Sequence, residues 1–344
     1  MPGVLPYTIS YLLPPLVVAA ARLGGWWTWL PVAVLYLGLP VADALAQLDH
    51  VHRAPDDAER LTHQARYRLV TWAWVPVQTA LVLWAVWFVG QHPPTPLELA
   101  GLIVSLGSVT GGVGITYAHE LVHRTGRFEL ALGDVLLALV SFPQFAVEHV
   151  HSHHRHVGTP LDPTSARRGE SLYAFIVRSV TGGAAAVWQI EADRLAKRGI
   201  PPWSPGNRAL RYAATMLVVP LVAWGLGGTP GLVLFVGQSI VAIVLVQGIN
   251  YVEHYGLSRR ELSPGRYERV AARHSWDSSH RVTNWLLINL ARHADHHLVA
   301  AKRFQTLDTT DDAPQLPAGY ATMLMVAMVP PLWRRLIDPR IPSA

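Results

Sequence analysis

Six long apolar segments constrain the fold of this chain more than any other feature of its sequence. Each runs for about 20 residues without an Asp, Glu, Lys or Arg, which is the length that an α-helix needs to cross ~30 Å of hydrocarbon. The sequence therefore predicts an all-α integral membrane protein that forms one membrane domain over residues 1–344. We expect its six transmembrane helices at roughly 3–21, 23–42, 69–90, 99–118, 212–230 and 231–252.

The composition supports a membrane protein and limits its chemistry. Hydrophobic residues make up 51% of the chain and charged residues only 15%, a balance that is unusual for a soluble enzyme. The absence of cysteine excludes disulfides, thiolate-ligated zinc or haem, and cysteine-ligated iron–sulfur clusters. If the reaction needs electrons, another protein must therefore deliver them. No Lys or Arg precedes Arg22, so we expect the first span to be retained rather than cleaved as a signal peptide.

The distribution of basic residues predicts the orientation of the bundle. If the N-terminus is cytoplasmic, the long polar stretches 43–68, 119–211 and 253–344 all lie inside the cell. These stretches contain 27 of the 28 Lys and Arg residues, and Arg22 is the exception. Because cytoplasmic loops carry the excess of Lys and Arg, this orientation is favoured.

Residues 130–147 form a further apolar stretch, interrupted by Asp134. A seventh crossing there would put His123 and His149 on opposite sides of the membrane and separate groups that look suited to one site. We therefore interpret 130–147 as a re-entrant or interfacial helix.

Seventeen histidines are concentrated in the polar stretches, and their spacing indicates a metal site. Thirteen lie between residues 119 and 297, and none lies within a predicted span. Three His-x-x-x-His pairs occur, and since residues four apart share a face of an α-helix, each pair can direct two imidazoles at one metal. The clustered histidines are His119, His123, His149, His153, His154, His254, His293, His296 and His297.

Nine imidazoles exceed the needs of a single ion, so the sequence predicts two metals. Imidazole suits zinc, copper, iron and nickel, and spacing alone does not choose among them. The four clusters also contain the acidic residues Glu120, Glu148, Glu253 and Asp295. We expect these carboxylates to accept the second imidazole proton, with direct metal ligation as the alternative.

The remaining histidines are interpreted differently. We expect the isolated His50, His52, His63 and His92 to be ordinary surface residues. A second set lies near the clusters but outside the His-x-x-x-His spacing, and these are expected to support the site indirectly or to lie on the surface: His151, His156, His274 and His280.

Two other functions could use these histidines. The segment His119-Glu120-x-x-His123 matches the H-E-x-x-H motif of zinc metalloproteases, in which the glutamate is the general base. An intramembrane protease would need only one further ligand, which leaves most of the clustered histidines unexplained. A metal transporter would hold its site near the bilayer midplane, whereas these clusters lie at or beyond the ends of the spans. The sequence therefore favours a two-metal enzyme.

The segments around the clusters resemble the histidine boxes of membrane alkane 1-monooxygenases. The segment Asn250-Tyr-x-Glu253-His254-Tyr-Gly256 distinguishes that family from fatty-acid desaturases with similar boxes, and the resemblance extends over about residues 40 to 340. Departures from the family pattern are Ser152, Ala291 and Ala294, none of which is a ligand position. The other similar segments are His119-Glu-Leu-Val-His123-Arg124, Glu148-His149-x-x-x-His153-His154, Gly158-Thr-Pro-Leu-Asp162-Pro163 and Leu290-Ala-Arg-His293-Ala-Asp295-His296-His297.

The resemblance implies a non-haem di-iron centre on the cytoplasmic side of a bacterial inner (plasma) membrane. Carried over position by position, the nine clustered histidines named above would be the iron ligands. The residues that would support the ligands are Glu120, Glu148, Glu253, Asp295 and Asp162.

The implied reaction is the O2-dependent terminal hydroxylation of a medium- or long-chain n-alkane to a primary alcohol. The alternatives are methyl-group hydroxylation of alkylbenzenes such as xylene or cymene, and fatty-acid hydroxylation or desaturation. An unreactive C–H bond offers no charge to bind, so we expect an apolar slot within the membrane bundle. Rubredoxin and its reductase would supply electrons, with a ferredoxin-type donor as the alternative, and we expect no nucleic-acid partner.

Two smaller features lead to structural expectations. Span 99–118 contains Gly107, Gly111, Gly112 and Gly114, which we interpret as close helix packing rather than as a substrate channel. Asp43 and Asp49 follow the second span, where they either support the histidine layer or are solvated caps.

Overall fold

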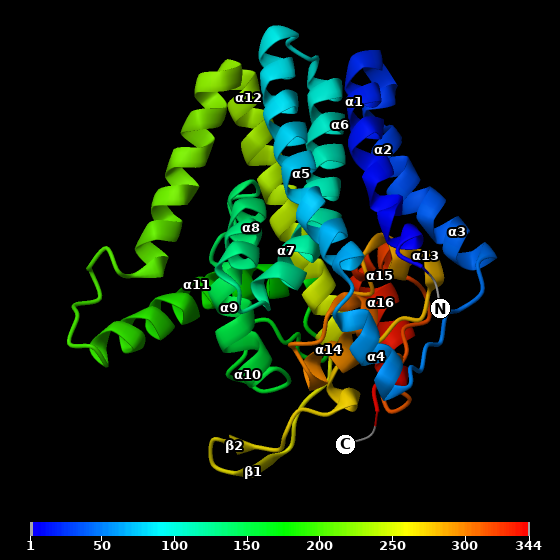
Figure 1. The fold of residues 1–344 in the computed structure, drawn as a ribbon. Helices are drawn as coiled ribbons and strands as arrows, with labels where there is room; N and C mark the ends of the chain where they lie inside the picture. Colours follow the sequence, from blue (N-terminus) through cyan, green and yellow to red (C-terminus); the bar gives the residue numbers. More distant parts are fainter. Residues whose placement is uncertain (1–2, 343–344) are drawn as a thin grey trace.

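The computed structural model describes residues 3–342, and the chain is almost entirely helical (Figure 1). Long helices stand side by side in the upper part of the view, and shorter helices and loops gather below them. The first half contains η1 (Leu5–Leu12), α1 (Leu13–Leu23), η2 (Gly25–Trp29), α2 (Leu30–Ala33), η3 (Val34–Gly38), α3 (Leu39–Leu45), α4 (Pro55–Thr62), α5 (Ala65–Gln91), α6 (Pro96–Gly107), η4 (Ser108–Gly114), α7 (Ile115–Val122), α8 (Arg127–Ala138), α9 (Phe145–Glu148), η5 (His149–His153) and α10 (His154–His156). The second half contains α11 (Leu172–Ala196), α12 (Arg208–His254), β1 (Glu261–Ser263), β2 (Arg266–Tyr267), η6 (Ala272–His274), α13 (Arg281–Leu286), α14 (His293–Leu298), η7 (Phe304–Thr306), α15 (Tyr320–Ala327), α16 (Pro330–Ile337) and η8 (Asp338–Arg340).

Within the described residues, four helical segments are long and apolar enough to cross a membrane. They contain five of the six predicted spans, because α12 contains two. The first predicted span, 3–21, lies in η1 and α1 and is not among the four. The four segments are Gly25–Leu45, Ala65–Gln91, Pro96–Val122 and Arg208–His254.

Helix α12 reverses direction at Gly228, which divides it into two limbs that diverge in Figure 1. Gly228 has φ 60° and ψ −156°, a conformation that glycine adopts without the steric cost of a Cβ. Near the reversal, α12 approaches α5 so closely that a Cβ on Gly90 would lie 2.6 Å from the Cα of Gly227. The reversal falls close to the predicted boundary between spans 212–230 and 231–252.

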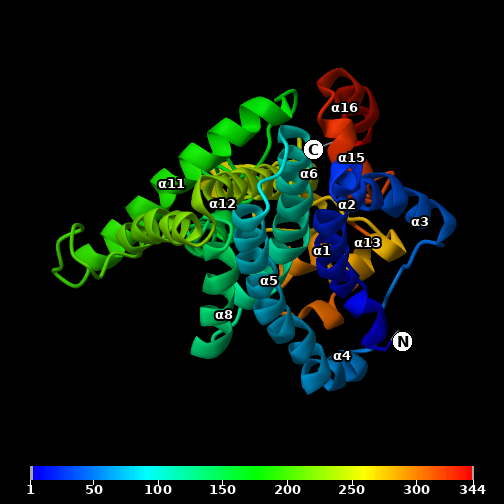
Figure 2. The same cartoon turned by 90° about the horizontal axis from the view of Figure 1, so that it is seen from above.

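The limbs of α12 have different surroundings. Seen from above (Figure 2), α11 and the first limb extend to one side, away from the group formed by α1, α5 and α6. The second limb packs against α5, α6 and η4 and carries the chain to His254.

The apolar segment 130–147 does not form one long helix. It contains most of α8, a turn at Ser141 (φ 50°), and the start of α9. The 12 residues of α8 extend about 18 Å, which is less than the ~30 Å of a hydrocarbon core. Helix α8 packs beside α7, so the chain leaves His123 and returns to the same region at His149.

Three of the four glycines of span 99–118 make the close contacts expected of helix packing. An added Cβ would meet Val241 at Gly107, Ala242 at Gly111 and Gln78 at Gly114, each at less than 3.0 Å. The packing interpretation is therefore confirmed for these three. Gly112 differs, since a Cβ there would meet nothing within 4 Å.

We expect Gly111→Ala to destabilise the fold and Gly112→Ala to leave it intact. A Cβ on Gly111 would lie 2.4 Å from the Cα of Ala242, and a backbone atom cannot move aside as a side chain can. Overpacking of this kind costs about 1–3 kcal/mol in the free energy of unfolding. Thermal unfolding of the two purified variants in detergent measures the difference. Equal unfolding temperatures would show that η4 and α12 are not packed as described.

Candidate metal centre

The nine histidines come from four parts of the chain, which gather in the lower part of Figure 1. Helix α7 and the residue after it provide two, η5 and α10 provide three, the end of α12 provides one and α14 provides three. In that order they are His119 and His123; His149, His153 and His154; His254; and His293, His296 and His297.

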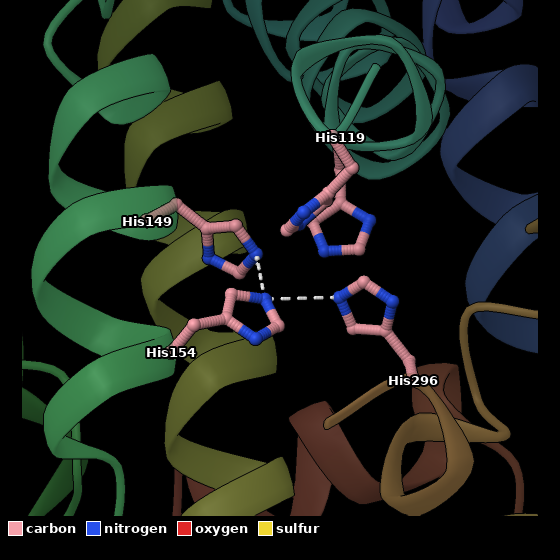
Figure 3. A group of neighbouring side chains, drawn as sticks. His119, His149, His154 and His296 are labelled. Atoms are coloured by element: carbon pink, nitrogen blue, oxygen red, sulfur yellow. Dashed lines mark hydrogen bonds between the residues drawn. The ribbon is translucent and has the colours of Figure 1, made fainter. Parts of the chain in front are cut away.

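The nine side chains form two groups. Within each group the potential ligand atoms all lie within 4.8 Å of one another. Figure 3 shows members of the larger group pointing toward one another from separate segments. The five-histidine group is His119, His123, His149, His154 and His296, and the four-histidine group is His153, His254, His293 and His297.

The expectation that each His-x-x-x-His pair serves one metal is wrong for His149 and His153. These two lie in different groups, and His149 shares its group with His154 instead. The cause is η5, a π-helical turn, in which residues five apart rather than four apart align. The Nε2 atoms of His149 and His154 are accordingly only 3.0 Å apart.

The geometry of both groups fits metal ions. Nitrogens about 2.1 Å from one ion lie about 3 Å apart when they are neighbours in its coordination sphere. The corresponding Nε2 separations are 3.1 Å between His154 and His296, 3.1 Å between His254 and His293, and 2.9 Å between His293 and His297. The Nε2 atoms of His119 and His123 are buried without a hydrogen-bond partner, as expected of donors that await a metal.

Burial also keeps most of these imidazoles in the form that binds metal. Desolvation, together with repulsion between neighbouring rings, lowers the pKa of His123, His149 and His297 well below its usual value. The rings are therefore uncharged, and each has a nitrogen lone pair available.

His153 has a different environment. Burial alone would lower its pKa, but Asp162 opposes that effect and the pKa is raised. The Nδ1 of His153 lies 2.8 Å from Oδ2 of Asp162 and 2.9 Å from Oγ1 of Thr164, which also donates to Oδ1 of Asp162. Asp162 is thus placed to accept the Nδ1 proton of His153, as predicted. Thr164 is a further polar neighbour of His153 that the sequence did not reveal.

The other acidic candidates have different contacts. Glu120 accepts from Arg124 and from the backbone N–H of Phe304, and Asp295 accepts from Lys302 at 2.7 Å. Within residues 3–342, neither forms a hydrogen bond or an ion pair with an imidazole, so the expectation that they accept an imidazole proton is wrong. Each pairs instead with a basic residue of the 302–303 segment. Oε1 of Glu148 lies 3.2 Å from the Thr164 hydroxyl, and burial raises the pKa of Glu148 to about 7.

Glu253 has the most unusual surroundings among the acidic residues. Its Oε2 lies 3.3 Å from Nε2 of His293, on the side of the ring that faces the other histidines. Its Oε1 accepts a hydrogen bond from Tyr320 at 2.9 Å. Glu253 is buried, and no Lys or Arg of residues 3–342 forms an ion pair with it.

Helix α14, which carries three of the histidines, is fixed by buried polar contacts at its N-terminus. Asp277 accepts from the backbone N–H of Ala294 at 2.7 Å, and Asp49 pairs with the buried Arg292 at 2.9 Å. Asp43 accepts from the N–H groups of Val282 and Thr283 at the start of α13. Asp49 thus supports the histidine layer through Arg292, whereas Asp43 is buried and holds the start of α13, which carries none of the clustered histidines. Asp277 gave no signal in the sequence.

An apolar cavity leads from the membrane helices to both histidine groups. The cavity is narrow. Residues of η4, α7, α9, η5 and the second limb of α12 line it, together with Leu290 and His293. They include Ile115, Thr116, Val246, Ile249, Leu290, His119, His149, His293 and Glu253.

The remaining histidines stay outside both groups. Those expected on the surface are exposed: His50, His52, His63 and His92. Of the second set, His274 is buried, and its carbonyl oxygen lies 3.3 Å from Nδ1 of His254. It therefore supports a clustered histidine through its backbone.

Comparison with known proteins extends these observations. Residues 93–327 match the family described as fatty acid desaturase. Alkane 1-monooxygenase 1 of Pseudomonas aeruginosa is 42% identical over 321 residues, which cover 92% of this chain and 83% of the relative. Alkane 1-monooxygenase 2 of the same species is 39% identical over 320 residues, covering 92% and 84%. The xylene/toluene monooxygenase hydroxylase component of Pseudomonas putida is 30% identical over 336 residues, covering 96% and 88%.

The residues that match the fatty acid desaturase family include all nine clustered histidines. The candidate metal centre therefore lies entirely within the matched region. With such identity to curated relatives over 92% of its length, the chain belongs to the alkane 1-monooxygenase family.

Proposed function

We propose that this protein hydroxylates the terminal methyl group of medium- or long-chain n-alkanes, with O2 as co-substrate. The observation that carries the proposal is the position of the two histidine groups at the end of an apolar cavity between membrane helices. The curated relatives named alkane 1-monooxygenase support the choice of substrate class.

The nine histidines are proposed to hold two iron ions, one in each group. The five-histidine group would bind one ion and the four-histidine group the other. Bound iron would supply the redox chemistry that activates O2, so that one oxygen atom enters the alcohol and the other leaves as water. Asp162 would keep His153 oriented by accepting its Nδ1 proton.

The cavity would position the substrate, since an alkane offers no charge or hydrogen bond. Val246 and Ile249 on α12 and Ile115 on α7 would hold the chain by apolar contact, with its end beside His119, His149 and His293. A fixed geometry of this kind selects which carbon reacts and keeps water from the reacting atoms.

The proposed topology has six transmembrane helices, a cytoplasmic N-terminus and a re-entrant segment at 130–147. The first span would be η1 with α1, and the reversal at Gly228 supports two crossings by α12. The centre would then face the cytoplasm at the inner membrane of a bacterium. There, rubredoxin with its reductase, or a ferredoxin-type donor, would deliver the electrons that this cysteine-free chain cannot carry in a cluster of its own.

A second candidate function is methyl-group hydroxylation of alkylbenzenes. The specific observation in its favour is the 30% identity to the xylene/toluene monooxygenase component over 96% of this chain. Turnover of n-octane, n-dodecane and p-xylene by the purified protein with rubredoxin and its reductase separates the candidates. Hydroxylation of p-xylene alone would replace the n-alkane proposal with this second one.

We expect Val246→Phe to reduce n-alkane turnover at least tenfold by occupying the cavity, because a bulky side chain would fill space that the substrate needs. The matched control is Val244→Phe, on the same limb of α12 but exposed on its outer face. Gas chromatography of the alcohols formed from a series of n-alkanes measures the effect. Equal turnover by the two variants would show that the cavity is not the substrate site.

A further inference from the structure

A second cleft, separate from the metal centre, lies between α8 and the first limb of α12. It opens to the surface and is much wider than the cavity beside the histidines. Neither histidine group lines it. This cleft therefore has room for a molecule larger than an alkane chain.

Two opposite charges face this cleft without an ion-pair partner. Asp134 on α8 and Arg211 on α12 both line it, and neither forms an ion pair within residues 3–342. Arg208, which also lines the cleft, is already bound to Glu191 at 2.8 Å. The carboxylate of Asp134 and the guanidinium of Arg211 thus line the same cleft from two different helices.

The rest of the cleft is largely apolar. Leu130, Val135 and Ala138 of α8 line one wall, and Pro143 and Val150 continue it. The adjoining limb of α12 exposes large apolar side chains that would contact hydrocarbon, including Leu217 and Leu221. A surface of this kind is suited to acyl chains.

The charged end of the cleft lies where the limb would enter the membrane. Arg208 and Arg211 directly precede the predicted span 212–230, and Tyr212 lines the cleft beside them. Basic and aromatic residues concentrate at this boundary, the level of lipid headgroups. The Asp134 carboxylate is exposed on this cleft, so a cationic headgroup can approach it and take the place of water.

We propose that this cleft binds one phospholipid with an amino headgroup. Arg211 binds the lipid phosphate, Asp134 binds the ammonium group, and the acyl chains lie along the wall formed by α8. A purely anionic lipid would satisfy Arg211 but would leave Asp134 without a partner, so the pair of charges selects a zwitterionic headgroup. This proposal does not rest on the proposed hydroxylation, because neither Asp134 nor Arg211 belongs to a histidine group.

Native mass spectrometry of the full-length protein, stripped of lipid in detergent and titrated with one lipid at a time, tests the proposal. We expect phosphatidylethanolamine to bind roughly tenfold more tightly than phosphatidylglycerol, a difference of about 1.4 kcal/mol, because only the first lipid offers Asp134 an ammonium group. Asp134→Asn should remove this preference, and Arg211→Gln should weaken the binding of both lipids. Equal affinity of the wild-type protein for the two lipids would overturn the amino-headgroup assignment.

Two further variants separate binding in the cleft from general attraction of lipid to the bundle. Asp193→Asn with Arg198→Gln makes the same charge changes at exposed positions near the end of α11, and should leave the preference unchanged. Ala138→Trp fills the apolar wall without changing a charge, and should weaken the binding of both lipids. Wild-type binding by Ala138→Trp, or loss of the preference in the α11 variant, would contradict the proposal.

Discussion

Replacing His296 and His297 one at a time is expected to remove different metals, although the two residues are neighbours in sequence. His296 belongs to the five-histidine group and His297 to the four-histidine group. Each variant should therefore retain about one iron per chain where the unchanged protein holds about two, and turnover should fall at least a hundredfold because both ions are needed. Iron analysis of the purified variants gives the number of ions.

Mössbauer spectra of protein loaded with 57Fe identify which ion remains. The two groups differ in their number of nitrogen donors, so the subspectrum lost in His296→Ala should be the one retained in His297→Ala. His92→Ala is the control, since His92 is exposed and lies in neither group. If both variants lost the same subspectrum, the division of the histidines into two groups would be wrong.

The sequence predicted features that depend on local pattern. An apolar segment of the right length is helical in a membrane wherever it occurs, because unpaired backbone groups are too costly in hydrocarbon. Five of the six predicted spans accordingly fall in long apolar helices. The paired charges in the 302–303 segment could not be predicted in this way, because Glu120 and Arg303 meet only after the chain has folded.

The division of the nine histidines into two groups shows a second limit of prediction from sequence. The spacing rule assumes α-helical geometry, and it holds for His119 with His123 and for His293 with His297. It fails at His149 because η5 is a π-helix, and spacing gives no warning of that local change. The roles of Thr164 and Asp277 depend on contacts with His153 and α14 and were likewise invisible in the sequence.

The second large effect is expected for Glu253→Gln, which should weaken metal binding by the four-histidine group. A buried carboxylate is tolerated when a cation or a metal compensates its charge. Glu170 has Arg178 for this purpose and Asp295 has Lys302, but within residues 3–342 Glu253 accepts a hydrogen bond only from the hydroxyl of Tyr320. Its other oxygen lies 3.3 Å from Nε2 of His293, about the distance expected between two neighbouring ligands of one ion.

Glutamine has almost the same shape as glutamate and can still accept from Tyr320, so Glu253→Gln removes the charge with little change in packing. We expect iron in the four-histidine group to bind about 10–100-fold more weakly, as when a group that supports or joins a metal site is lost. Tyr320→Phe should have a smaller effect in the same direction, because the carboxylate keeps its charge but loses one contact.

Release of 57Fe to a chelator, followed by Mössbauer spectroscopy, distinguishes this role from simple destabilisation. Glu170→Gln is the matched control: it neutralises a carboxylate that Arg178 already compensates, so it should change the unfolding temperature but not the rate of iron loss. If Glu253→Gln released iron at the rate of the unchanged protein and kept both subspectra, the carboxyl would be buried as a neutral acid. In that case Glu253 would not compensate the charge of the two ions, and the nine imidazoles would be the only side chains of the centre that bind them.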